Sequence, residues 1–226
     1  MRPPEPPAEG LRDALAEIGD ALALGLTGAQ IDVLLAYLAL LQRWNATYNL
    51  TAIRDPAQML TQHLADCLAV IGPLRRQGGD DGQHRRILDV GSGGGLPGLV
   101  IAALNPGHHV TCVDTVGKKA AFVRQSAGEL GLKNLTAEHA RVEQLKAAPS
   151  DVIVSRAFAS LTDFTRLTRV QLAPKGVWMA MKGKTPGDEI AELPPGLDVF
   201  HVEHLNVPGL QAERCLVWIR PQNPSL

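Results

Sequence analysis

The sequence predicts an α/β fold: a seven-stranded, mostly parallel sheet that ends in an antiparallel hairpin and is preceded by a helical extension. After residue 84, short β-rich runs alternate with helical stretches, which is typical of parallel strands joined by right-handed crossovers. The last two β-rich runs have no helical stretch between them, which indicates a hairpin that closes the sheet. Before residue 78, only helical periodicity is present.

Residues 11–77 are expected to form the helical extension, because apolar residues recur there at spacings of three and four. Thr27 can cap the second helix, and Asp55 with Pro56 can begin the third. The apolar face of the third helix is expected to hold Leu60, Leu64, Cys67 and Ile71. Residues 1–10 are rich in proline and are expected to form a disordered tail.

The sheet domain is placed at residues 84–222, after a glycine-rich boundary at Gly78–Gly82. The expected strands are Arg86–Val90, His109–Asp114, Leu135–Glu138, Asp151–Ser155, Val177–Lys182, Asp198–Leu205 and Glu213–Arg220. The expected helical stretches are Leu96–Leu104, Lys118–Leu130, Val142–Ala147 and Leu161–Gln171. Pro97 is expected at a first helical position, where its missing N–H costs nothing.

Composition narrows the class of protein. A hydrophobic content of 45% with 20% charged residues fits a soluble globular chain, and no apolar run is long enough for a membrane span. The formal net charge of −1 means that any nucleic-acid contact must use a local basic patch. The cysteines Cys67, Cys112 and Cys215 share no metal-ligand spacing and are expected to be buried free thiols, which suits a cytoplasmic protein that binds no metal.

A glycine-rich loop follows the first strand. Five glycines lie within residues 91–98, and such a loop directs backbone N–H groups at a ligand and lets it approach the main chain closely. We expect Gly91, Gly93 and Gly95 to lie next to a nucleotide-type cofactor. For Gly98, tight packing between helix and strand is the equal alternative.

Polar side chains follow the other strands of the sheet, at the edge where open α/β folds bind ligands. Asp114 ends the second strand and can accept the hydroxyl groups of a ribose, or it can only cap the next helix. Arg156 follows the fourth strand, and Lys182 ends the fifth. These strand ends support the glycine loop as one wall of a ligand site.

The segment 93–98 satisfies the dinucleotide fingerprint G-x-G-x-x-G, which alone is a weak signal. The closing hairpin and the missing second catalytic domain argue against NAD. Asp89, two residues before the first glycine, makes the segment resemble the first motif of class I S-adenosylmethionine (SAM) methyltransferases. That resemblance implies SAM as the cofactor and a Rossmann-like methyltransferase fold.

A closer resemblance covers about residues 34–220. The blocks that carry it are Trp44–Thr51, Arg54–Pro56, His63–Asp66, Asp89–Gly98, Asp114–Lys119, Arg141–Glu143, Ser155–Ser160 and Lys182–Gly183. Together they resemble the bacterial small-subunit rRNA guanine-N7 methyltransferases, also called glucose-inhibited division protein B. One departure is Gly94, where some relatives are expected to carry proline.

The resemblance implies roles for residues at the strand ends. Asp114 would hold the ribose, Val142 and Glu143 would flank the adenine, and Arg156 would line the methyl-transfer end. The full set of expected cofactor-binding residues is Asp89, Gly91, Gly93, Gly95, Leu96, Asp114, Val142, Glu143 and Arg156. Arg156 is also the expected catalytic residue, holding the guanine through O6; a phosphate or the cofactor carboxylate is its alternative ligand.

The implied activity is methyl transfer from SAM to N7 of a guanine in 16S rRNA, by a monomer acting on the RNA or on the 30S subunit. Residues expected to bind RNA are Arg54, Lys118, Lys119, Arg124 and Lys182, each with a solvated charge as its alternative. Two other functions stay open. One is a SAM-dependent methyltransferase of another substrate, and the other is a nucleotide-binding, ribosome-associated module without catalysis.

Three further side-chain groups are singled out near these motifs. His63 and Asp66 are three apart on a helix and are expected to form a structural hydrogen-bonded pair. Tyr48, Asn49 and Thr51 are expected to shape a lid between the extension and the cofactor cleft, with an N-cap role as the alternative for the last two. Phe158 is expected in the core, with stacking on the base as the alternative.

Overall fold

The computed structural model describes residues 9–78, 84–156 and 158–222, and the elements below belong to these ranges. One seven-stranded sheet has the strand order β3-β2-β1-β4-β5-β7-β6. The strands are β1 (Arg86–Val90), β2 (His109–Asp114), β3 (Leu135–His139), β4 (Ser150–Ser155), β5 (Leu172–Lys182), β6 (Leu197–His204) and β7 (Cys215–Pro221). β1 to β5 pair in parallel, and β7 is antiparallel to both β5 and β6. The predicted parallel sheet with a closing hairpin is confirmed.

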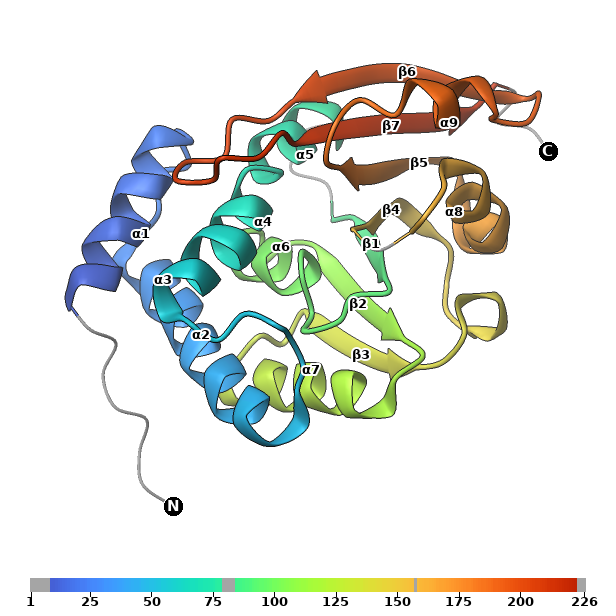
Figure 1. Cartoon of the computed structure of the whole chain (residues 1–226). Coiled ribbons are helices and arrows are strands. Elements are labelled where there is room, and N and C mark those ends of the chain that lie inside the picture. Colours follow the sequence, from blue (N-terminus) through green and yellow to red (C-terminus); the bar gives the residue numbers. More distant parts are fainter. Residues whose placement is uncertain (1–8, 79–83, 157, 223–226) are drawn as a thin grey trace.

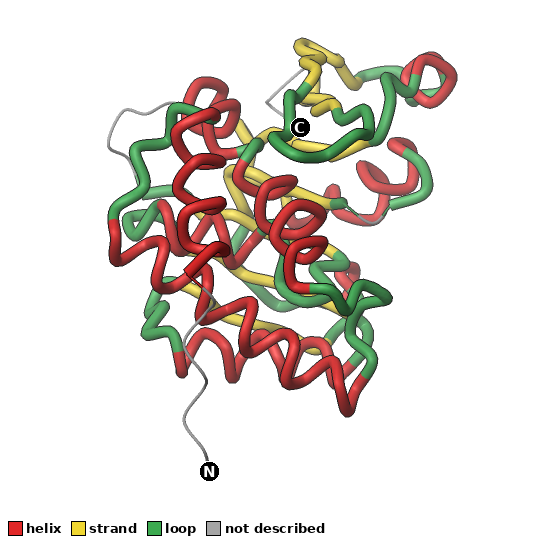
Figure 2. Tube along the Cα trace, turned by 60° about the vertical axis from the view of Figure 1, so that its left-hand side comes forward, coloured by secondary structure: helices red, strands yellow, loops and turns green. Residues whose placement is uncertain are grey.

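Helices cover both faces of this sheet (Figure 1). The extension contains α1 (Glu9–Ala21), α2 (Gly28–Tyr48), α3 (Pro56–Met59), the π-helix η1 (Leu60–Ala65), α4 (Asp66–Leu68) and α5 (Ile71–Gly78). The sheet domain adds α6 (Gly98–Leu104), α7 (Gly117–Glu129), the 3-10 turn η2 (Val142–Gln144), α8 (Leu161–Thr168), the 3-10 turn η3 (Arg169–Gln171) and α9 (Gly187–Ala191). Figure 2 shows the helices of the extension in front of the strands.

Alternate residues of each strand enter two different cores, as expected for a sheet buried on both faces. Ile87 packs in the core that contains the extension, α6 and α7, whereas its neighbour Leu88 packs with Phe164 of α8 and the hairpin. The extension therefore shares one hydrophobic core with the sheet and packs against α6 and α7 on one of its faces.

The expected helix starts are confirmed by their capping contacts. The Thr27 side chain accepts from Gln30 N, and the Gln30 side chain accepts from Thr27 N, so a capping box begins α2. Asp55 Oδ1 accepts from Gln58 N at 2.8 Å, with Pro56 at the start of α3. The side chains of Leu60, Leu64, Cys67 and Ile71 are buried as expected.

Several boundaries differ from the prediction. α1 begins at Glu9, so the expected tail is helical at its last two residues, while residues 1–8 lie outside the described part. Gly78 ends α5, and the rest of the expected boundary segment lies outside the described residues. Pro97 precedes α6 as its N-cap and is not its first helical residue.

The helix expected at Val142–Ala147 is wrong, since only the 3-10 turn Val142–Gln144 forms. Gln171 Nε2 donates to the carbonyls of Val142 at 3.3 Å and Leu145 at 2.9 Å. A side chain thereby satisfies carbonyl groups that a continuing helix would have used, and Leu145 is already extended.

The three cysteines are buried and free, as predicted. No helix in the described part of the chain is both long and apolar enough to cross a membrane. Among the described residues, no group of three or more potential metal ligands comes together.

Candidate active site

The glycine loop turns sharply at the end of β1. Gly91 and Gly93 have φ of +69° and +59°, and Gly95 has φ of +87°, a region that side-chain-bearing residues rarely adopt. Gly91 N donates to the carbonyl of Val113 at 2.9 Å, which attaches the loop to β2. The loop backbone is therefore shaped by residues that glycine alone suits.

Asp89, in β1, bonds to the end of this loop. Its carboxylate is fully buried, and Oδ2 accepts from Gly98 N at 2.8 Å. Burial raises the pKa of Asp89 to about 7, although the bond from Gly98 N opposes the shift. Oδ1 has no hydrogen-bond partner among the described residues. A Cβ on Gly98 would lie 2.5 Å from Cys112 Sγ, so Gly98 serves tight packing.

Asp114 joins the loop to the next helix and lines a cavity. Its Oδ2 accepts from Gly93 N at 2.9 Å, and its Oδ1 accepts from Val116 N at 2.8 Å. A carboxylate has about four acceptor sites, so this residue retains capacity for further donors. Asp114 therefore bonds to Val116, the N-cap of α7, and also lines the cavity. Its role toward a ribose stays a prediction.

The cavity has a volume of about 250 Å³ and lies at the carboxyl ends of the strands, near the lower end of the size range of small-molecule sites. Its wall includes Gly91, Asp114, Val142, Glu143 and Phe158. The position agrees with the general location of ligand sites in open α/β sheets. A larger cavity of about 850 Å³ lies around Lys175 at the opposite end of β5, away from the glycine loop.

The structure therefore brings together part of the expected cofactor set. Asp89 and Leu96 are buried behind the loop, and neither is among the residues that line the cavity. Phe158 is half-buried, with its ring 5.1 Å from that of Phe164, and it also lines the cavity. It packs against the core as expected and also lines the cavity, while stacking on the base stays a prediction.

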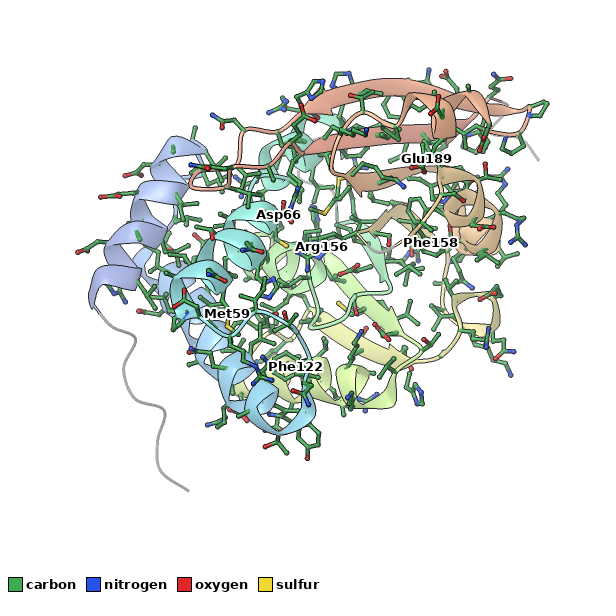
Figure 3. The ribbon with its side chains drawn as sticks, viewed as in Figure 1. Met59, Asp66, Phe122, Arg156, Phe158 and Glu189 are labelled. Carbon is green, nitrogen blue, oxygen red and sulfur yellow. The ribbon has the colours of Figure 1, made fainter. Side chains whose placement is uncertain are left out.

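Arg156 lies away from this cavity and faces the extension. Its Nη1 is 3.3 Å from Asp66 Oδ2, 3.4 Å from the Gln62 carbonyl and 3.9 Å from Cys67 Sγ. The side chain is 31% exposed, so part of it remains accessible from solvent. Figure 3 shows Asp66 and Arg156 close together near the centre of the molecule.

Asp66 connects two distant arginines. Oδ2 faces Arg156, and Oδ1 accepts from Arg214 Nε at 2.8 Å. Arg214 is the residue directly before β7. The Asp66 side chain is only 3% exposed. One buried carboxylate therefore joins the extension, the end of β4 and the C-terminal hairpin. We call the set Asp66, Arg156 and Arg214 the arginine seam.

The predicted His63–Asp66 pair is wrong. His63 Nε2 lies 3.0 Å from Thr51 Oγ1, and burial, followed by the positive charge of Arg156, lowers the pKa of His63. The two residues lie on and after the π-helix η1, whose wider turn changes the directions of side chains three residues apart. His63 thereby fixes the loop that contains Thr51, and Asp66 is left for the arginines.

The residues expected to contact RNA occupy different environments. Arg54 Nη2 donates to Asn49 Oδ1 at 2.8 Å, Lys118 Nζ donates to the Tyr48 carbonyl at 2.7 Å, and Arg124 Nη2 donates to the Ala137 carbonyl at 2.9 Å. These three are exposed, and Lys119 is half-buried. Lys182 forms an ion pair with Glu189 at 2.7 Å, and its side chain is only 13% exposed.

Sequence reasoning missed Asp66, Arg214 and Glu189 as organising residues. Asp66 was noticed, but with the wrong partner, and Arg214 and Glu189 lie in segments without a motif. Glu189 bonds Lys182 and also accepts from Leu161 N at 2.8 Å, at the start of α8. These two partners are 7 and 28 residues away in the sequence, so no local pattern around Glu189 predicts either contact.

This is a class I SAM-methyltransferase fold. Its features are the strand order, the glycine loop after β1 and the acidic residue Asp114 at the end of β2. TrmN from Thermus thermophilus has the same fold, with a TM-score of 0.55 and 21% identity over 72% of this chain and 53% of that one. A Burkholderia thailandensis 1,6-didemethyltoxoflavin-N1-methyltransferase, solved with S-adenosylhomocysteine, gives a TM-score of 0.55 and 18% identity over 83% and 90% of the two chains.

Sequence comparison specifies the family. The GidB family, described as rRNA small subunit methyltransferase G, matches residues 30–217. Proteins named ribosomal RNA small subunit methyltransferase G from Acidovorax ebreus and Leptothrix cholodnii are each 61% identical to the chain. The alignments cover 93% and 94% of this chain and 96% of each relative. The chain belongs to the GidB family of rRNA small subunit methyltransferases.

Proposed function

We propose that this enzyme transfers a methyl group from SAM to N7 of a guanine in 16S rRNA of the small ribosomal subunit. The observation that carries the proposal is the cavity lined by Gly91 and Asp114, in a chain of the GidB family. The name of the relatives supports the ribosomal substrate, and the guanine and its N7 atom follow from the family resemblance in the sequence.

The residues around the cavity fit the cofactor. Asp114 retains acceptor capacity for ribose hydroxyls, because only two of its acceptor sites are used by Gly93 N and Val116 N. Val142 offers an apolar surface and Glu143 an exposed carboxylate on the same wall, where an adenine would lie. Gly91 lines the cavity and Gly93 has open space where a Cβ would stand, so the loop backbone is accessible at both. Gly95 packs against Val123 of α7, and Leu96 and Asp89 are buried behind the loop.

The chemistry requires positioning more than proton transfer. When bound, SAM supplies an electrophilic methyl group on a positively charged sulfur, and N7 of guanine has an in-plane lone pair and no proton. No general base is needed, which agrees with a site built from backbone and a few polar groups. The protein contributes alignment and exclusion of water, and both depend on rigid surroundings.

Arg156 is the residue we assign to the guanine. Its guanidinium is held on the extension side by Asp66 and the Gln62 carbonyl, while the side chain keeps some exposure. A fixed guanidinium can donate to O6, next to N7, and orient the base. The family's helical extension thereby acts as the support of the transfer end.

The test is transfer of tritium from labelled SAM to 30S subunits and to naked 16S rRNA, followed by digestion to nucleosides. The label is expected in 7-methylguanosine, and the comparison of the two RNAs identifies the form that is modified. Label in another nucleoside or only in protein would contradict the proposal. Retained SAM binding without transfer to any RNA would favour the non-catalytic module.

A calorimetric titration tests the cofactor separately. Wild-type protein is expected to bind SAM and not NAD, and Asp114→Ala is expected to weaken SAM binding at least tenfold, because one charged acceptor is worth about 1.5–3 kcal/mol. Asp163→Ala is the matched control, since Asp163 is an exposed partner of Arg166 on α8. Equal SAM affinity in the two variants would remove Asp114 from the ribose site.

A further inference from the structure

An exposed aromatic ring ends the long helix of the extension. The side chain of Tyr48 is 44% exposed, although one of its faces packs against Trp44 with ring centroids 4.9 Å apart. Trp44 in turn meets Phe122 of α7 at 5.4 Å in an edge arrangement. Since Phe122 is fully buried, this row of rings fixes Tyr48 on the domain and leaves part of its ring open to solvent.

Two cations bond to groups at the end of the helix that contains this ring. Lys118 Nζ donates to the carbonyl of Tyr48 itself at 2.7 Å, and Arg54 Nη2 donates to the side chain of the following residue, Asn49, at 2.8 Å. Both cationic residues are exposed. An exposed aromatic ring, with two cations that bond to its own carbonyl and to the next residue, is a combination that single-stranded nucleic-acid sites use.

The same surface reaches the wall of the cofactor cavity. Val116 is 37% exposed, and its N–H donates to Asp114 Oδ1 at 2.8 Å. Thr115, between them, lines the cavity. Among the described residues, the large hydrophobic side chains that are exposed are Tyr48, Val116 and Val170. Lys118, two residues after Val116, bonds to the Tyr48 carbonyl, so the first two lie on segments that meet. We call the set Tyr48, Arg54, Val116 and Lys118 the Tyr48 platform.

We propose that an unpaired nucleotide of the RNA substrate, close to the target guanine, stacks its base on Tyr48 and places its phosphate between Arg54 and Lys118. This inference rests on the proposed function, because it assigns a contact to the same RNA. Stacking on an aromatic ring tolerates any base, so the platform contributes affinity and direction and leaves the choice of guanine to the cavity side.

The charge pattern favours RNA as the occupant over a protein segment. A chain with a net charge of −1 must gather cations locally to bind a polyanion, and Arg54 and Lys118 do so beside the exposed ring. Their contacts to Asn49 and the Tyr48 carbonyl also hold the two side chains in place, which lowers the entropy lost when a phosphate binds.

The experiment compares Tyr48→Ala with Tyr48→Phe, using SAM affinity, methyl transfer to 30S subunits and 16S rRNA, and direct RNA binding by fluorescence anisotropy. Stacking of one base is worth about 1–3 kcal/mol, so Tyr48→Ala is expected to raise KM for RNA and the RNA Kd by about 5- to 150-fold. The Kd for SAM should not change. Tyr48→Phe keeps the ring and is expected to restore most of the RNA affinity.

Val170→Ala is the matched control, because Val170 is a hydrophobic residue with 70% exposure that is outside the platform. It is expected to behave as wild type in every assay. The double variant Arg54→Gln/Lys118→Gln should reduce the slope of log affinity against log salt by about 0.7, the value for the one phosphate that the two cations share. Melting temperatures establish that each variant is folded.

Two outcomes would overturn the platform. Tyr48→Ala with wild-type RNA affinity would show that no base stacks there, and Tyr48→Phe as weak as Tyr48→Ala would exclude stacking as the cause. These results differ from failure of the proposed function, in which the wild-type enzyme itself labels no RNA. If the wild type binds RNA without methylating it, the anisotropy comparison still decides the platform; if it binds no RNA, both proposals fail.

Discussion

The glycine loop and the arginine seam lie at the same edge of the sheet but are built in opposite ways. The loop takes its shape from glycines at positive φ and from Asp89 and Asp114, all within one β-α-β segment. The seam depends on the Asp66 carboxylate and on Arg156 and Arg214. These two arginines are 90 and 148 residues away from Asp66 in the sequence. The loop that we propose binds the cofactor is thus encoded locally, whereas the seam that we propose supports the transfer end is held by tertiary structure.

The largest effect is expected from Asp66→Asn, which removes the shared charge and leaves two arginines without it. Breaking a buried ion pair from one side costs about 3–5 kcal/mol, and the partial exposure of the arginines reduces this to about 2–3 kcal/mol. The free energy of unfolding, measured in urea, should fall by that amount. The rate of methyl transfer should fall, while the Kd for SAM stays within a few-fold of wild type.

The matched control for the seam is Asp163→Asn, in which an exposed pair with Arg166 is broken. No resolvable change in the free energy of unfolding is expected there, because surface ion pairs contribute little. If the two variants lose equal stability, or if Asp66→Asn loses SAM affinity as strongly as rate, the seam is not a separate support of the transfer end.

Gly98→Ala tests the loop side of the comparison. A Cβ at this position would lie 2.5 Å from Cys112 Sγ and 2.9 Å from Asp89 Oδ2, so the strand and α6 must separate. Overpacking of this kind costs about 1–3 kcal/mol, and SAM affinity should fall together with stability because the loop moves. Gly128→Ala, in α7 with open space around its Cβ, should be neutral or stabilising. A wild-type urea midpoint for Gly98→Ala would mean that the packing is loose.

Asp89→Asn tests whether burying this carboxylate below the loop lowers the stability of the folded protein. Because the pKa rises from 3.8 to about 7, the folded protein holds a proton that the unfolded chain has lost between about pH 4 and 7. The contribution of Asp89 to stability therefore decreases as pH rises through this window and is constant above it. Between pH 5.5 and 7.5, Asp89→Asn should gain about 1–2 kcal/mol relative to wild type in urea denaturation. A difference that does not change with pH would contradict the raised pKa.

The sequence predicted the loop side well because its signals are local. The strands β1 and β2 have the expected bounds, and Asp114 lines the cavity as expected. Signals of this kind, such as a glycine at positive φ or an acid at a strand end, need no knowledge of distant residues.

The seam could not be predicted from spacing. An α-helical pattern places His63 and Asp66 on one face, but η1 is a π-helix and the two side chains find different partners, Thr51 and the arginines. The missing helix after Val142 has a similar origin, since the distant Gln171 captures its carbonyls. In both places a tertiary contact overrides a local preference, which is why a single sequence gave the wrong geometry.

The sharpest separation of folding from binding is expected from Gly93→Ala paired with Gly131→Ala. Both glycines have positive φ, +59° and +67°, and neither would place a Cβ within 4 Å of another atom. Each alanine should therefore cost about 1–2 kcal/mol of backbone strain and nothing from packing. Only Gly93 lies in the loop, where its N–H also bonds Asp114. Calorimetry should show weaker SAM binding for Gly93→Ala and wild-type affinity for Gly131→Ala; equal affinities would mean that the cofactor does not approach the loop backbone at Gly93.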